Sequence, residues 1–122
     1  MRLPDIVALV GSEAEYTAAL DESHRRAVVL FKHSPTCPVS AAALSEFVAF
    51  VEEEPSAAAF RLVDVIGSRA VARLIASRCG VKHESPQALV FRDGRVVGHA
   101  SHGALDFEWF RENARGAKDG AA

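Results

Sequence analysis

Two cysteines, Cys37 and Cys79, are the residues of this sequence with the clearest potential for chemistry. Cys37 follows the apolar run 27–31 after a short polar stretch, and it directly precedes Pro38, a residue that suits the first turn of a helix. We therefore expect Cys37 at a helix N-terminus, where unpaired N–H groups and the positive end of the helix dipole favour a thiolate. The thiolate is the nucleophilic form of cysteine, so this position predicts thiol–disulfide exchange. Ser40, three residues further on, is expected on the same helical face, with its hydroxyl donating a hydrogen bond to the sulfur.

Each cysteine also has a purely structural interpretation. A cysteine before a helix is often a small buried hydrophobic residue, but Pro35 and Pro38 bracket Cys37 and keep it out of regular packing. Cys79 lies four residues after Ile75, on the apolar side of a predicted helix, and this place favours a packed core thiol over a redox role. Neither cysteine belongs to a paired ligand motif, so no zinc site is predicted.

The other candidates are a Ser-Pro step and five scattered histidines. Ser85-Pro86 precedes a predicted strand, and the residues alone leave open whether its peptide bond is trans, as most are, or cis. The closest pair, His99 and His102, lacks a third metal ligand, so we expect solvated histidine side chains there and no metal site. His33 and His83 flank the two candidate segments, and they either raise the local positive potential or lie at the surface.

The elements that position these residues alternate between helices and strands. Helices are predicted over 12–22, from Pro38 to Pro55, over 67–79 and over 104–114, and strands over 27–31, 60–65, 87–91 and 95–98, with a further edge strand over 6–10. This alternation favours a parallel core, to which the closing hairpin through Asp93-Gly94 adds antiparallel strands. The prediction is a single α/β domain over 1–114, with helices on both faces of a mixed four- or five-stranded sheet, and a disordered tail over 115–122.

Composition narrows the functional classes. The chain has 122 residues, of which 49% are apolar and 25% charged, as in one ordinary globular domain. A net charge of −2 without a basic cluster predicts binding neither to nucleic acid nor to a membrane surface. The longest apolar runs are strand-sized, and the start of the chain lacks the features of a secretory signal. We therefore expect a cytoplasmic protein, in which a stable structural disulfide is not favoured.

A resemblance to a known family is carried by two segments of the chain. They are Phe31-Lys32-His33-Ser34-Pro35-Thr36-Cys37-Pro38-Val39-Ser40 and Val81-Lys82-His83-Glu84-Ser85-Pro86-Gln87. Together they resemble the thioredoxin fold and, within it, the monothiol bacilliredoxins, bacterial proteins of the bacillithiol system. The resemblance implies that Cys37 is the single active-site cysteine, supported by Thr36 and Pro38. It also implies that Ser40 stands where a dithiol thioredoxin has its resolving cysteine.

The second segment has an implied role in substrate binding. Pro86 matches the cis proline that faces the active site of the family, and the backbone of Ser85 would pair with an incoming disulfide. Bacillithiol carries carboxylates, so Lys82, His83 or Lys32 would favour it electrostatically. Each of these roles is an expectation from the resemblance.

The implied activity is a monothiol oxidoreductase without a metal or an organic cofactor, for which bacillithiol is a co-substrate. Because position 40 is a serine, Cys37 would take bacillithiol from a client protein and keep it as a mixed disulfide. The implied partners are bacillithiolated client proteins and the bacillithiol or reductase that regenerates Cys37. Two alternatives stay open: a monothiol iron–sulfur carrier, for which Pro38 and Val39 are unfavourable, and a non-catalytic thioredoxin-like docking module.

Overall fold

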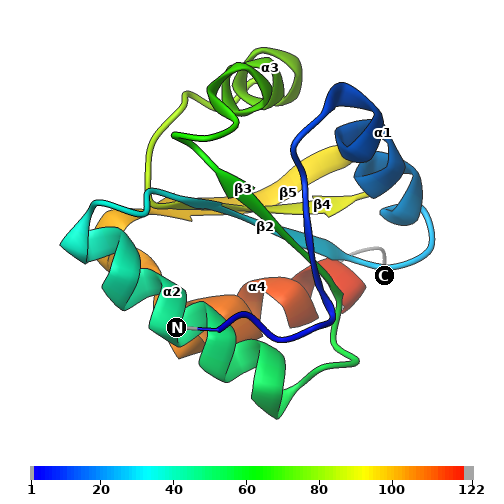
Figure 1. Cartoon of the computed structure of the whole chain (residues 1–122). Coiled ribbons are helices and arrows are strands. Elements are labelled where there is room, and N and C mark those ends of the chain that lie inside the picture. Colours follow the sequence, from blue (N-terminus) through cyan, green and yellow to red (C-terminus); the bar gives the residue numbers. More distant parts are fainter. Residues whose placement is uncertain (1, 120–122) are drawn as a thin grey trace.

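Five strands form the sheet of the computed structural model, which describes residues 2–119, with side chains as far as residue 115 (Figure 1). The strands are β1 (Val7–Leu9), β2 (Val28–His33), β3 (Ala59–Asp64), β4 (Gln87–Arg92) and β5 (Arg95–Ser101), in the order β1-β3-β2-β4-β5. β1, β3 and β2 run parallel, whereas β4 is antiparallel to both β2 and β5. The prediction of a mixed sheet is therefore confirmed, and the edge strand predicted over 6–10 is β1, the fifth strand.

Helices cover both faces of this sheet, as predicted (Figure 1). α1 (Glu13–Glu22) and α3 (Arg69–Cys79) lie over one face, and α2 (Pro38–Glu53) and α4 (Phe107–Asp119) lie over the other. A short 3-10 helix, η1 (His102–Ala104), connects β5 to α4. None of the helices within the described residues is both long and apolar enough to cross a membrane.

The two faces of the sheet bury different side chains. Under α2 and α4 lies an aromatic core, in which the Phe31 and Phe47 rings stack at 5.1 Å and Phe47 meets Phe60 edge to face at 6.0 Å. Under α1 and α3 the core is mainly aliphatic, with Leu30 and Ile75 wholly buried. β2 is the central strand and serves both cores because its side chains alternate between the faces, which explains its continuous apolar run.

The local signals of the sequence act as expected at three boundaries. The Ser12 Oγ accepts a hydrogen bond from the Glu15 N–H at 3.1 Å and caps α1. Gly80 ends α3 in the left-handed conformation, with φ of 77°. Asp93 and Gly94 both have positive φ values, as the tight turn between β4 and β5 requires.

The last helix differs from its prediction over 104–114. α4 begins at Phe107, because the Asp106 Oδ1 accepts a hydrogen bond from the Trp109 N–H at 2.8 Å and acts as the cap. The helix continues to Asp119, so the segment 115–119 is helical where a disordered tail was predicted. Residues 120–122 of the predicted tail lie outside the described residues.

Candidate functional site

Cys37 lies at the N-terminus of α2, as its sequence context predicted. The residue is the N-cap, with φ of −104° and ψ of 121°, and Pro38 occupies the first turn. A tight turn joins it to β2, since the Cys37 N–H donates to the Ser34 carbonyl at 3.2 Å. The Cys37 side chain is half-buried, and those of Thr36, Pro38 and Val39 are exposed. The thiol thus stands at the positive end of a 16-residue helix, at the surface of the molecule.

Ser40 is wholly buried and does not act as predicted. Its Oγ accepts a hydrogen bond from the Ser34 N–H at 2.9 Å and lies 2.7 Å from the His33 Nδ1. Among the described residues it makes no hydrogen bond to the Cys37 sulfur, so the predicted bond is wrong. The physical reason is that the turn before α2 offers the Ser40 hydroxyl two other partners, the Ser34 N–H and the His33 ring. Ser40 therefore braces the turn that carries Cys37.

His33 is the last residue of β2 and is half-buried beside this turn. Burial lowers the pKa of the His33 ring, against the opposing attraction of Asp64. Its ordinary pKa is already below 7, so the ring is neutral at neutral pH. His33 therefore shares a hydrogen bond with the Ser40 hydroxyl, and its neutral ring does not add the positive potential that was one of its two predicted roles.

The Ser85–Pro86 peptide bond is cis, as the resemblance implied. Pro86 is buried and leads directly into Gln87, the first residue of β4. Gln87 pairs with Lys32 near the end of β2, the strand that leads to Cys37. The sheet thus brings the cis-proline segment and the Cys37 turn to the same end of two neighbouring strands. The Ser85 Oγ is buried with no hydrogen-bond partner in the described part of the chain.

The predicted basic groups occupy different environments. Lys82 and His83 have exposed side chains in the segment before the cis bond. The pKa of His83 is lowered, first by burial and then by the charges of Lys32 and Arg73, so this ring is also neutral at neutral pH. Lys32 is wholly buried, which excludes direct contact with bacillithiol. Its charge still acts on His83, so its predicted electrostatic role stays a prediction.

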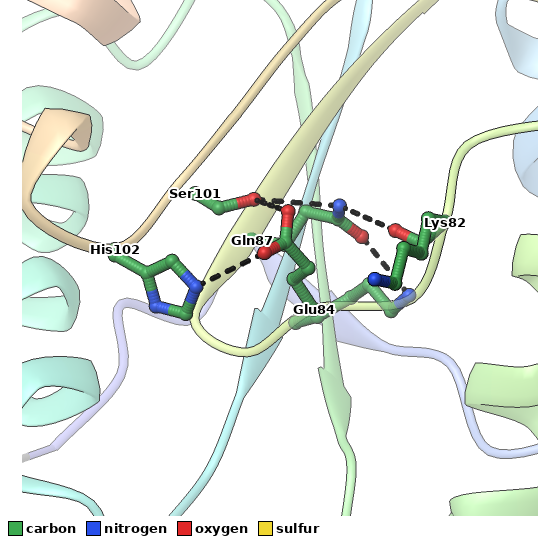
Figure 2. A network of polar contacts seen from close by, with 6 residues as sticks. Lys82, Glu84, Gln87, Ser101 and His102 are labelled. Carbon is green, nitrogen blue, oxygen red and sulfur yellow. Dashed lines mark hydrogen bonds and ion pairs between the residues drawn. The ribbon is translucent and has the colours of Figure 1, made fainter.

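A polar network that the sequence did not predict connects the segment before β4 to the end of β5 (Figure 2). Gln87 is 1% exposed and stands at its centre, between Lys82 and Ser101, while Glu84 connects Ser101 to His102. A glutamine that begins a strand gives no particular signal. The available signal was Lys32, a charged residue directly after the apolar run 27–31 of the central strand.

Cys79 is the last residue of α3 and is half-buried. It packs at the edge of the aliphatic core and lines a cavity of about 300 Å³ with Tyr16 and Phe91. This position agrees with the predicted packed thiol. Phe91 lies near the hairpin turn, at the end of β4 opposite to Gln87.

Solved structures place this fold in the class of thioredoxin-fold proteins. A structure described as that of a candidate oxidoreductase with a thioredoxin fold is similar, with a TM-score of 0.80 and 30% identity, covering 88% of this chain and 93% of that chain. Thioredoxin from Fasciola hepatica has a TM-score of 0.70 at 19% identity, covering 88% of this chain and 96% of its own. Thioredoxin from Trypanosoma brucei brucei has a TM-score of 0.71 at 20% identity, covering 94% of each chain. These two thioredoxins show the fold alone.

The family within this class is more specific. A family model described as monothiol bacilliredoxin BrxC matches residues 9–109, a range that includes the Cys37 turn and the cis-proline segment. The chain belongs to the monothiol bacilliredoxin family. Family and fold together support a thiol redox role for the protein.

Proposed function

We propose that the protein removes bacillithiol from mixed disulfides on client proteins in the cytoplasm, using Cys37 as the nucleophile. The observation that carries this proposal is the half-buried thiol at the N-terminus of α2, beside a cis-proline segment and without a cysteine at position 40. The first feature favours a thiolate, and the last removes a partner for an internal disulfide within the motif.

The proposed exchange begins when the Cys37 thiolate attacks the bacillithiol sulfur of the client disulfide. The client–bacillithiol S–S bond breaks, the client sulfur leaves as a thiolate and takes a proton, and a Cys37–bacillithiol disulfide forms. The client is reduced and Cys37 is oxidised. A second thiolate, from bacillithiol or a reductase partner, then attacks the bacillithiol sulfur of this disulfide, forms a new disulfide with it and releases Cys37 as a thiolate. Neither step requires a metal or an organic cofactor.

The segment before the cis bond is the proposed place of substrate contact. The backbone of Ser85 is available to pair with the client disulfide. Lys82 is exposed and offers a positive charge to the carboxylates of bacillithiol, whereas the neutral ring of His83 offers hydrogen bonds. The buried Pro86 fixes the direction in which this segment enters β4.

The experiment compares one client protein carrying three different small thiols: bacillithiol, glutathione or cysteine. Reduced protein is added, and the freed client thiol is followed by mass spectrometry over time. We expect release of bacillithiol to be the fastest, with one bacillithiol mass transferred per protein chain. Release at equal rates from all three clients would contradict bacillithiol specificity. No release from any of them would contradict the proposed function.

A further inference from the structure

We propose that Lys32 is a positioning residue, which holds the cis-Pro86 segment in the shape that receives the client disulfide. It acts through a hydrogen-bonded chain that crosses β2, β4 and β5 and ends on the segment 82–86. This inference rests on the proposed function, because the segment 82–86 is the proposed place of substrate contact and the hydrogen-bonded side chains are inferred to hold it.

Three side chains at one level of the sheet form the inner part of the network. Lys32 on β2 pairs in register with Gln87 on β4, and Gln87 pairs with Ser101 on β5. The Lys32 Nζ donates to the Gln87 Oε1 at 3.1 Å, and the Gln87 Nε2 lies 3.4 Å from the Ser101 Oγ. The central strand is thereby connected to the edge strand by side chains as well as by backbone.

The direction of these bonds fixes the orientation of the Gln87 amide. A lysine amine donates hydrogen bonds, so Gln87 must present its carbonyl oxygen to Lys32 and its NH₂ group to the opposite side. There the Nε2 donates to the Lys82 carbonyl at 2.9 Å (Figure 2). This bond joins the residue that follows the cis-proline to a residue five positions earlier and closes the segment into a loop.

An outer set of bonds holds the same loop from β5. The Ser101 Oγ donates to the Glu84 carboxylate at 3.1 Å, and the His102 Nε2 lies 3.2 Å from the same carboxylate (Figure 2). The His102 N–H donates to the Pro86 carbonyl at 2.9 Å. The loop is thus fixed at Lys82, Glu84 and Pro86, on both sides of Ser85.

Stability of the core does not explain a lysine at this place. The Lys32 side chain is 0% exposed, and removing an ammonium group from water costs free energy. Burial lowers the pKa of Lys32 to about 8, so the group is still mainly charged at pH 7. A charged donor makes a stronger hydrogen bond than a neutral one. The effect of Lys32 is therefore a firm orientation of Gln87, and its burial excludes direct contact with a client.

The central test is Lys32→Met, which keeps an unbranched side chain and removes the donor. We expect the KM for the bacillithiolated client to rise about tenfold, as for the loss of one charge-assisted hydrogen bond, with kcat changed by less than about twofold. Alkylation of Cys37 by iodoacetamide should keep the rate of the parent, because the turn and the helix are untouched. This split distinguishes a loop effect from an effect on the thiol.

A matched pair at Ser101 supplies a second test that leaves the core lysine in place. Ser101→Ala removes the bonds to Gln87 and Glu84, whereas Ser101→Thr keeps a hydroxyl. We expect the alanine variant to raise KM and the threonine variant to restore it to within about twofold of the parent. If Lys32→Met does not fold, Lys32→Gln, which keeps an unbranched polar side chain without the charge, is measured in the same way, and the same rise of KM is expected; an unchanged KM in that variant would overturn the role of Lys32.

Amide hydrogen exchange separates this inference from the proposed function. In Lys32→Met and Ser101→Ala the His102 amide, which donates to the Pro86 carbonyl, should exchange at least about tenfold faster than in the parent, relative to amides of β3. A parent that releases no client overturns the proposed function, and exchange still tests the network. Unchanged exchange and unchanged KM in folded variants overturn the role of Lys32. A fall in kcat and in Cys37 alkylation also overturns it, because Lys32 would then act on the thiol.

Discussion

Cys37 and Cys79 are both half-buried and both lie at the end of a helix, yet the two ends are opposite. Cys37 is the N-cap of α2, whereas Cys79 is the last residue of α3, just before the left-handed Gly80. A helix N-terminus carries partial positive charge and a C-terminus partial negative charge. Cys37 therefore lies at a positive helix end and Cys79 at a negative one. Helix direction distinguishes the two cysteines more clearly than exposure does.

The surroundings of the two thiols add to this difference. Cys37 is flanked by three exposed residues, Thr36, Pro38 and Val39. Cys79 packs against the aliphatic core, and its cavity is lined by the buried Tyr16. One thiol thus lies among exposed residues at the surface, and the other packs at the edge of a core.

The largest expected effect comes from removing each thiol in turn. Cys37→Ser should reduce release of the client thiol to the background rate, because no nucleophile remains at the site. Cys79→Ser should keep the rate within about twofold of the parent, because its thiol lies in a packed region. The rate of client-thiol release, measured in samples quenched at successive times, compares both variants with the parent. Equal losses in the two variants would remove the distinction between the two cysteines.

The next effect concerns the fate of the captured thiol. Ser40→Cys places a second thiol three residues after Cys37 on α2, where it can attack the Cys37 disulfide. We expect this variant to release bound bacillithiol without an external thiol, as followed by intact mass. Ser40→Ala is the matched control, since it removes the same bonds to His33 and Ser34 and adds no thiol. A Ser40→Cys protein that accumulates the adduct like Ser40→Ala would contradict the assumed geometry.

Stability should differ between the anchors of the two helices. Phe47 anchors α2 in the aromatic core, and Phe47→Ala should lower the free energy of unfolding by about 3–5 kcal/mol. Ile75 anchors α3 in the aliphatic core, and the smaller change Ile75→Val should cost about 0.5–1.5 kcal/mol. Urea unfolding measures both. A cost below about 1 kcal/mol for Phe47→Ala would show that the helix of Cys37 is not anchored in this way.

An effect confined to alkaline pH is expected from Lys32. Its folded pKa of about 8 lies below the ordinary 10.5, so between these values the unfolded chain binds a proton that the folded chain does not. Raising the pH through this range removes that advantage of the unfolded state. The unfolding free energy of the parent should therefore rise relative to that of Lys32→Met between pH 8 and 10.5. Parallel curves for the two proteins would contradict the lowered pKa.

The place of Cys37 could be predicted because it depends on local signals. An apolar strand followed by a polar turn and Pro38 leaves few conformations for the residue between them. The cis bond before Pro86 is different, since a Ser-Pro step takes either form, and only the resemblance implied the right one. Spacing also placed Ser40 on the correct helix without identifying its partners. Those partners, His33 and Ser34, lie in the segment before α2, and only the fold of that turn brings them to the Ser40 hydroxyl.

Lys32 and the start of α4 depended on context that the sequence carries only weakly. A lysine after an apolar run usually marks a strand that reaches water, but here the partner strand β4 brings the Gln87 side chain to meet it. For α4, the apolar pair Ala104 and Leu105 suggested a helix that had already begun. Asp106 is a known type of cap and was the better signal.

The most direct test of the central claim is the location of the captured thiol. Reduced protein is mixed with an equal amount of bacillithiolated client, free thiols are blocked, and the peptides containing Cys37 and Cys79 are analysed by mass spectrometry without reduction. We expect one bacillithiol mass on the Cys37 peptide and, on the Cys79 peptide, only the mass of the blocking reagent. A bacillithiol adduct on Cys79, with Cys37 left free, would contradict the claim.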